Sequence, residues 1–245
     1  MRNPSFLISL FLIICCGTPL FASDLSPGDA SWIKSGDKGE FKTYYRDVKG
    51  SGTREVLMVG IIDAPPARCF KVVGDYEAFP KFMPYIQFTK VINSEKKEEN
   101  KTINYVFFFL SPPMVSYRYY SLRLVDEKQV DGKPNTFRSK WTLVTKGPYR
   151  KTPTDADIKK HLKSSWQEPI ETSFNEGSWL FEPLENGQKT RVKYYVWTNP
   201  GGSIPNWIAN KANSVALPAL WKALKKRLKH TKYDPQKVPE TSSPK

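Results

Sequence analysis

The sequence has few of the residues from which metal sites, disulfide frameworks and hydrolytic centres are usually built. It contains three cysteines and two histidines in 245 residues. Cys15 and Cys16 lie in an apolar N-terminal stretch, so removal of that stretch would leave only Cys69 and no internal disulfide. His161 and His230 lie among lysines and polar residues, without zinc-ligand spacing or a Ser-His-Asp arrangement. We therefore expect no metal, no cofactor and no catalytic residue.

The chain also lacks an apolar run long enough to span a membrane comfortably. The longest run, residues 6–16, follows Arg2 and precedes a small residue, Ala22, at a plausible cleavage point. Residues 1–22 are therefore predicted to be a secretory signal, and the protein is predicted to be exported to a bacterial periplasm. A retained N-terminal membrane segment or a lipidated cysteine is the alternative.

Charge and composition exclude some partners and favour one large domain. The net charge is +14, but the basic residues are scattered and are not gathered with base-stacking aromatics, so no nucleic-acid partner is expected. Aromatic residues make up 13% of the chain, enough for a large core or a lined cavity. No Pro/Gly/Ser-rich linker divides the middle. We predict an N-terminal segment at residues 23–38, one domain at 39–230, a disordered tail at 231–245 and a monomer.

The middle of the chain has the two-residue period of antiparallel strands. Asp63 or Ala64 is expected to cap a short helix that carries Cys69 as a buried, inert thiol, and residues 76–82 form a second helical piece. An insertion at residues 146–165 is expected to hold a small helix capped by Thr154. The predicted strands cover residues 40–48, 54–62, 86–93, 102–110, 117–125, 136–144, 170–175, 178–183 and 190–198.

A long amphipathic helix follows the strands, at residues 204–229. Gly201 and Gly202 break the last strand, Ser203 or Ile204 is the expected N-cap, and Pro205 fits the first helical position. Pro218 removes one backbone hydrogen bond and predicts a kink. The expected fold class is α+β: a curved antiparallel sheet wrapped around this helix, with an internal hydrophobic cavity where the two do not close completely.

Four stretches of the sequence resemble the START (StAR-related lipid-transfer) domains, of the helix-grip fold in the START-like superfamily. They are residues 62–84, which begin Ile62-Asp63-Ala64-Pro65-Pro66, then 111–120, 177–184 and 200–207. One departure is Tyr119, which follows Arg118 where the family usually has an acidic residue. The resemblance implies a secreted bacterial protein that binds a sterol, hopanoid, phospholipid or similar lipid and transfers it in the cell envelope. A polyketide cyclase or aromatase on the same fold, and an envelope interaction module without a ligand, remain open.

The cavity implied by this resemblance would be lined by aromatic strand residues and by one face of the helix. Packing in an ordinary core would also explain each residue taken alone. Arg118 and Arg123 are five residues apart, so at most one can point into the cavity. Tyr117, Tyr119 and Arg123 are expected on one face, and Arg118, Tyr120, Leu122 and Leu124 on the other. The predicted lining residues are Tyr105, Phe107, Phe109, Tyr117, Arg118, Arg123, Trp141, Trp179, Phe181, Tyr195, Trp197, Trp207, Ile208, Val215 and Leu220.

The final helix has two further predicted roles. As a lid over the cavity it would hinge at Gly201, Gly202 and Pro218. Its C-terminal end carries a basic cluster, which is either a solvated face favourable at a helix C-terminus or a docking site for an anionic membrane. The basic cluster consists of Lys222, Lys225, Lys226, Arg227 and Lys229.

Overall fold

The computed structural model describes most of the chain and leaves both ends aside. The predicted secretory signal, and the small helix predicted after Thr154, lie outside the described residues, as do the side chains of residues 206–207 and 209–214. The described residues are 31–112, 115–154, 159, 161 and 168–234.

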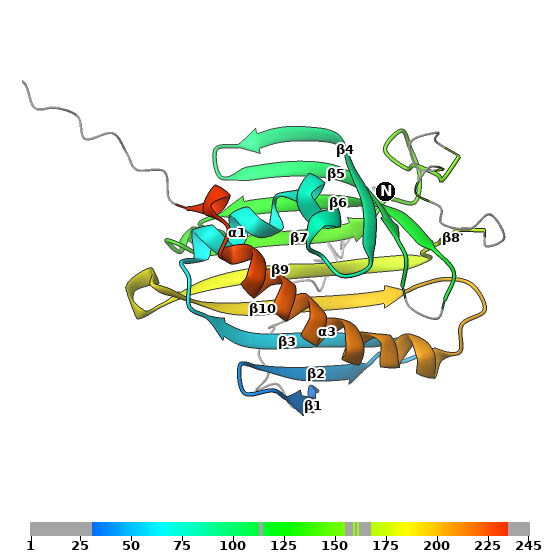
Figure 1. Ribbon diagram of the computed structural model, residues 1–245, viewed down its shortest axis with the longest axis horizontal. Coiled ribbons are helices and arrows are strands. Elements are labelled where there is room, and N and C mark those ends of the chain that lie inside the picture. Colours follow the sequence, from blue (N-terminus) through cyan, green and yellow to red (C-terminus); the bar gives the residue numbers. More distant parts are fainter. Residues whose placement is uncertain (1–30, 113–114, 155–158, 160, 162–167, 235–245) are drawn as a thin grey trace, which may run out of the picture.

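Within these residues, ten strands form one antiparallel sheet that curves around a long helix (Figure 1). The strand order is β1-β2-β3-β10-β9-β7-β6-β5-β4, and the short β8 pairs in parallel with β6. The strands are β1 (Ile33–Asp37), β2 (Phe41–Asp47), β3 (Arg54–Ile62), β4 (Ile86–Glu98), β5 (Lys101–Leu110), β6 (Arg118–Lys128), β7 (Phe137–Leu143), β8 (Ile170–Glu171), β9 (Phe174–Leu184) and β10 (Lys189–Asn199).

Helices cover one face of this sheet, which we call the inner face. α3 crosses it diagonally, and α1 and η1 lie over the same face beside the C-terminal end of α3 (Figure 1). The helical elements are α1 (Pro66–Val73), η1 (Tyr76–Lys81), η2 (Val130–Gly132), η3 (Glu185–Gly187), α3 (Asn206–Leu228) and η4 (Thr231–Tyr233). This is the predicted α+β arrangement of a curved sheet around a C-terminal helix.

The main core lies between α3 and the inner face. Leu217, Trp221, Leu224 and Leu228 are buried at steps of four, three and four residues, the spacing of one helix face. Burying such side chains contributes about 1.5–3 kcal/mol each. Trp221 packs on Phe41 with ring centroids 5.3 Å apart, and its indole Nε1 donates a hydrogen bond to Glu40.

A glycine makes room for this tryptophan. A Cβ at Gly60 would lie 2.7 Å from the Glu40 carbonyl oxygen and 2.8 Å from the Phe41 Cβ, and closer still to the Trp221 ring. The sheet backbone therefore approaches α3 closely at β3, which fixes the C-terminal half of the helix against the sheet.

Several predicted boundaries are wrong, each for a local reason. β9 is continuous where two strands were predicted, because Glu176 and Gly177 keep the ladder with β10. β4 runs to Glu98 because charged side chains are tolerated on an edge strand. Pro65 is the N-cap of α1 and Pro205 that of α3, so both helices begin later than predicted.

The two ends of the domain also extend beyond the predicted limits. β1 pairs with β2, so the sheet begins at Ile33, within the segment predicted to precede the domain. At the other end, Tyr233 of η4 is buried and its hydroxyl donates a 2.6 Å hydrogen bond to Asp75. Residues 231–234 therefore belong to the packed domain and not to a disordered tail.

Candidate functional site

Three of the predicted lining residues lie on the inner face. Trp141, Trp179 and Phe181 belong to the main core cluster with α3. Strand side chains alternate between faces, so these odd-numbered positions of β7 and β9 point toward the helix. Trp179 and Phe181 stack with centroids 6.0 Å apart and an interplanar angle of 7°. The structure therefore brings these three aromatic residues together beneath α3.

Four other predicted lining residues point away from α3. Phe107, Phe109 and Tyr117 form a separate cluster on the opposite, outer face, and Phe109 stacks on Tyr117 at 5.4 Å. Tyr105 shares the parity of Phe107 and lies 4.0 Å from the ring of Tyr149. The prediction that they line the inner cavity is wrong, because β5 is apolar on both faces and its alternation carried no polar side to distinguish them.

Tyr195, Trp197 and Arg123 are also on the outer face, which corrects their predicted place. The Tyr195 hydroxyl donates a 2.8 Å hydrogen bond to Glu55, and Trp197 Nε1 donates to Thr53 at 3.1 Å. Arg123 is paired in register with outward-facing Tyr105. The predicted grouping of faces on β6 is confirmed: Tyr117 and Tyr119 lie in the outer cluster, whereas Tyr120, Leu122 and Leu124 lie in the inner one.

On α3 the predicted residues divide in the same way. Leu220 is partly buried against the main cluster and Ile208 is partly buried. Val215 is 53% exposed, so its predicted place in the lining is wrong. The side chain of Trp207 is outside the described part of the structure. Leu217 was missed, although its spacing to Trp221 places it on the buried stripe.

Arg118 is buried at the end of β6 but contacts backbone rather than open space. It is 3% exposed and donates to the carbonyl oxygens of Pro200 at 2.7 Å, Ser116 at 2.7 Å and Gly201 at 3.3 Å. Burial lowers the pKa of the guanidinium. In this arrangement Arg118 fastens the turn before α3 and presents almost no surface to a ligand.

Two of the predicted hinge residues, Gly201 and Gly202, lie in this turn, and the third, Pro218, lies in the middle of α3. Gly201 and Gly202 both have φ of +72°, a conformation that favours glycine. A Cβ at Gly201 would lie 2.5 Å from the Glu171 carbonyl oxygen, so the turn rests directly on β8. Pro218 lies inside α3, which continues to Leu228. Their predicted movement stays a prediction.

Polar groups that the sequence did not single out lie within the apolar inner face. Asn175 of β9 is buried, and its Oδ1 accepts a 3.0 Å hydrogen bond from Trp141 Nε1. Tyr194 of β10 packs against Trp141 at 5.9 Å and Trp179 at 4.4 Å. Burial raises the pKa of Tyr194 and Tyr120 far above the usual range. We call Tyr120, Tyr194 and Asn175 the inner polar cluster.

A partly buried carboxylate lies farther along the inner face, near η1. Asp126 accepts hydrogen bonds from the Tyr76 hydroxyl at 2.7 Å and from Asn104 Nδ2 at 2.8 Å. Burial raises the pKa of Asp126, and these hydrogen bonds only partly oppose the shift. Because its oxygens are already engaged by the protein, Asp126 is not an open acid or base directed at a ligand.

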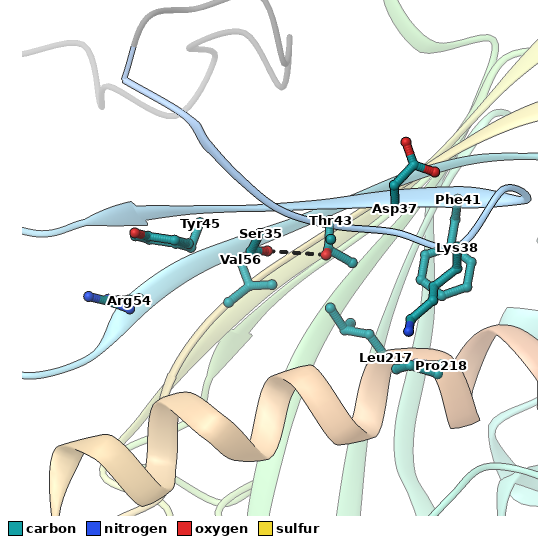
Figure 2. A pocket seen from close by; sticks show the side chains of 11 residues that line it. Ser35, Asp37, Lys38, Phe41, Thr43, Tyr45, Arg54, Val56, Leu217 and Pro218 are labelled. Atoms are coloured by element: carbon teal, nitrogen blue, oxygen red, sulfur yellow. Dashed lines mark hydrogen bonds between the residues drawn. The ribbon is translucent and has the colours of Figure 1, made fainter.

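A groove of about 510 Å³ opens where β1–β3 meet the middle of α3 (Figure 2). Arg54 lies at its edge in an ion pair with Asp47 at 2.7 Å. A neighbouring hollow of about 340 Å³ shares Lys38, Phe41 and Pro218 with it. Both charged and apolar residues line the groove. It therefore fits an entry route beside α3 better than the predicted hydrophobic cavity. Its lining is Ser35, Gly36, Asp37, Lys38, Phe41, Thr43, Tyr45, Arg54, Val56, Leu217 and Pro218.

The predicted basic cluster separates into engaged and open residues. Lys225 forms an ion pair with Glu40. Arg227 lies 3.8 Å from Asp75 and over the Phe82 ring at 5.0 Å. The remaining lysines are exposed, four and three residues apart along one side of α3, and have no ion-pair partner among the described residues. These open residues, the lysine stripe, are Lys222, Lys226 and Lys229.

Other kinds of site find no support in the described residues. No group of three or more His, Cys, Asp and Glu side chains there could hold a metal ion. The helices of this part of the chain include none long and apolar enough to cross a membrane. Cys69 is buried, as predicted, and burial raises the pKa of its thiol to about 11, which favours the inert thiol form.

Comparison with known proteins agrees with this geometry. The profile of the family described as polyketide cyclase / dehydrase and lipid transport matches residues 62–225. A STAR-related lipid transfer protein from Xanthomonas axonopodis is 24% identical, with a TM-score of 0.62 over 82% of this chain and 99% of that chain. Human STARD10 is 14% identical, with a TM-score of 0.64 over 81% and 73% of the two chains.

Human StAR-related lipid transfer protein 5 is 15% identical, with a TM-score of 0.63 over 82% of this chain and 88% of that chain. A search of curated proteins finds no match. At these identities the solved structures show the fold alone. The predicted helix-grip fold and the resemblance to START domains are therefore confirmed.

Proposed function

Because the chain belongs to the polyketide cyclase / dehydrase and lipid transport family, we propose that it binds a hydrophobic lipid between α3 and the inner face. One observation carries this proposal. Tyr120 and Tyr194 pack against the core cluster beneath α3, yet each remains only partly buried. Side chains that are surrounded by protein and still accessible border an internal space.

Transfer of the lipid is the second part of the proposal. We expect the bound molecule to be exchanged between membranes of the cell envelope, after export directed by residues 1–22. The turn at Gly201 and Gly202 is held by Arg118, and the groove opens beside Pro218 (Figure 2). Loosening α3 at these two places would connect the internal space with the surface. The sterols, hopanoids and phospholipids named by the resemblance are the candidate cargoes.

Lipid recovery tests binding directly. We expect the full chain, expressed in a bacterium and purified without detergent, to release about one lipid per protein on solvent extraction and mass spectrometry. A periplasmic protein of another fold, purified in parallel, controls for adventitious lipid. The intact mass reports whether residues 1–22 have been removed. Ligand-free protein that takes up no fluorescent sterol or phospholipid would exclude lipid binding.

Catalysis on the same scaffold is the second candidate, because the matched family covers cyclases as well as lipid transport. Asp126 is the observation that favours it, since burial raises the pKa of this inner-face carboxyl. Its engagement by Tyr76 and Asn104 favours the carrier. Recovered lipid that returns chemically unchanged after incubation with fresh protein supports a carrier, whereas a reproducible change in its mass supports an enzyme.

A further inference from the structure

The inner polar cluster has hydrogen-bonding capacity that the protein leaves unused. Among the described residues, the Tyr194 hydroxyl has no hydrogen-bond partner. It is nevertheless not one of the fully buried polar atoms that lack a partner. Its oxygen therefore faces accessible space. The Tyr120 hydroxyl, by contrast, interacts with the nearby Asn175 side chain. Buried polar groups without partners are costly, so a ligand that bonds to them is favoured.

The geometry places the Tyr194 phenol among aromatic rings. Gly177 has no side chain, and the Trp141 ring lies over it and reaches Tyr194 two strands away. Trp179 packs on Tyr194 with ring centroids 4.4 Å apart. Trp141 also donates a hydrogen bond to the Asn175 Oδ1. The Tyr194 phenol is therefore bordered by two tryptophan rings.

No charged side chain on the strands offers itself to this space. Arg118 lies two residues before Tyr120, but it is 3% exposed and its donors are taken by backbone carbonyls. Asp126 is in the cross-strand row that leads through Ser139 and Trp179 to Tyr194, but its oxygens accept from Tyr76 and Asn104. An anionic head group placed here would lose its hydration without gaining an accessible cation from the strands.

We propose that Tyr194 donates a hydrogen bond to an uncharged oxygen of the cargo, which is a neutral lipid bearing a hydroxyl or carbonyl group. This inference rests on the proposed lipid binding and narrows its chemical class. Fatty acids and phospholipids, whose polar ends are anionic or zwitterionic, fit the inner polar cluster less well. The tryptophans around Tyr194 supply apolar contact for the skeleton next to that oxygen.

Matched fluorescent probes test the inference. We would titrate the full chain with dehydroergosterol and its 3-sulfate, and with cis-parinaryl alcohol and cis-parinarate at pH 8. Each pair shares a skeleton and differs in charge. We expect at least one alcohol to bind about tenfold more tightly than its anionic partner. In Tyr194→Phe, affinity for that alcohol should fall about fivefold, the size of one neutral hydrogen bond, while affinity for the anion stays the same.

Tyr195→Phe is the matched control. It removes a hydroxyl from the next residue of β10, which points to the outer face and bonds to Glu55, so alcohol binding should equal that of the native chain. Circular dichroism establishes that both variants are folded. Tighter or equal binding of the anions, or unchanged alcohol affinity in Tyr194→Phe, would overturn the inference while leaving lipid binding intact. If the native chain binds none of the probes and yields no lipid on extraction, the proposed function fails with it.

Discussion

Gly177 is the single residue on which the shape of the inner face depends most directly. A Cβ there would lie 2.7 Å from Trp141 Cε2, and closer still to Trp141 Cζ2 and the Tyr195 carbonyl oxygen. Trp141 also holds Asn175 and borders Tyr194. Side-chain size at position 177 therefore controls both packing and the proposed ligand contacts.

We predict that Gly177→Ala lowers the free energy of unfolding by about 1–3 kcal/mol, the usual cost of overpacking a core. Urea denaturation followed by tryptophan fluorescence measures the loss. Ser178→Ala is the control, because Ser178 follows on the same strand and faces the other way; it should cost less. A Gly177→Ala variant as stable as the native chain would show that Trp141 has room to move.

Several features of the candidate site could not be predicted from the sequence, as individual residues show. Phe107, Phe108 and Phe109 are all buried, so alternation could place one face toward α3 but could not say which. Arg118 had the right parity for the inner face. Its hydrogen bonds to Pro200 and Gly201, however, depend on how the turn before α3 packs against the end of β6. The Tyr194 hydroxyl is distinguished by having no hydrogen-bond partner in the described part of the chain, which a sequence does not show.

At the scale of elements, the C-terminal end of α3 is tied to the rest of the domain through Asp75. This carboxylate, between α1 and η1, accepts hydrogen bonds from Lys232 at 2.6 Å and from the Tyr233 hydroxyl at 2.6 Å. Arg227 lies 3.8 Å away and also donates to the Tyr233 hydroxyl at 2.8 Å. One carboxylate thus connects α1, α3 and η4.

We predict that Asp75→Asn lowers the free energy of unfolding by about 1–2 kcal/mol at pH 7, because it removes the acceptor of charge-assisted hydrogen bonds. Lys232→Met, which removes one exposed donor, is the milder control. Thermal unfolding at neutral pH ranks the three proteins. An Asp75→Asn variant that matches the native chain would mean that η4 packs by its apolar contacts alone.

The native chain and the Asp75→Asn variant should also differ in how their free energy of unfolding depends on pH. Burial alone would raise the pKa of Asp75, but hydrogen bonds from Lys232 and Tyr233, with the charges of Lys232 and Arg227, outweigh it and lower the pKa below 3.8. A depressed folded-state pKa contributes stability that is present above the unfolded value and lost as pH falls through the folded one. The gap between native and Asp75→Asn should therefore narrow below about pH 4.

The elements themselves were the most predictable level. β3 begins and ends where it was predicted to, at Arg54 and Ile62, because glycine turns and a proline-rich helix start bound it. β1 was missed because its sequence, Ile-Lys-Ser-Gly-Asp, has little strand propensity and forms only by pairing with β2. Propensity decided the first case and tertiary pairing the second.

At the scale of the whole molecule, the order of elements and the apolar stripe of α3 were enough to predict the fold, because a curved sheet and one long helix have few ways to bury each other. The cargo could not be predicted, since the faces that line a cavity and fill a core have the same residue types. Under the proposal it is the Tyr194 hydroxyl, which has no hydrogen-bond partner among the described residues, and not composition, that distinguishes the two.

The lysine stripe is the surface that we expect to orient the whole molecule on an anionic membrane. Lys222, Lys226 and Lys229 are exposed, and Lys222 lines the hollow that neighbours the groove. We predict that changing all three to Gln weakens binding to vesicles of phosphatidylcholine and phosphatidylserine. Each lysine near an anionic surface is worth about 1 kcal/mol, so the loss should approach a hundredfold and shrink as salt is raised.

A variant with Lys42, Lys49 and Lys133 changed to Gln controls for net charge, because these lysines are also exposed and do not belong to α3. Vesicle flotation measures both variants, with phosphatidylcholine alone as the uncharged surface. If the two triple variants lose binding equally, only the net charge of +14 attracts the membrane. If only the stripe variant loses it, α3 faces the membrane, and the proposed exchange route beside Pro218 opens at the surface from which a lipid would be taken.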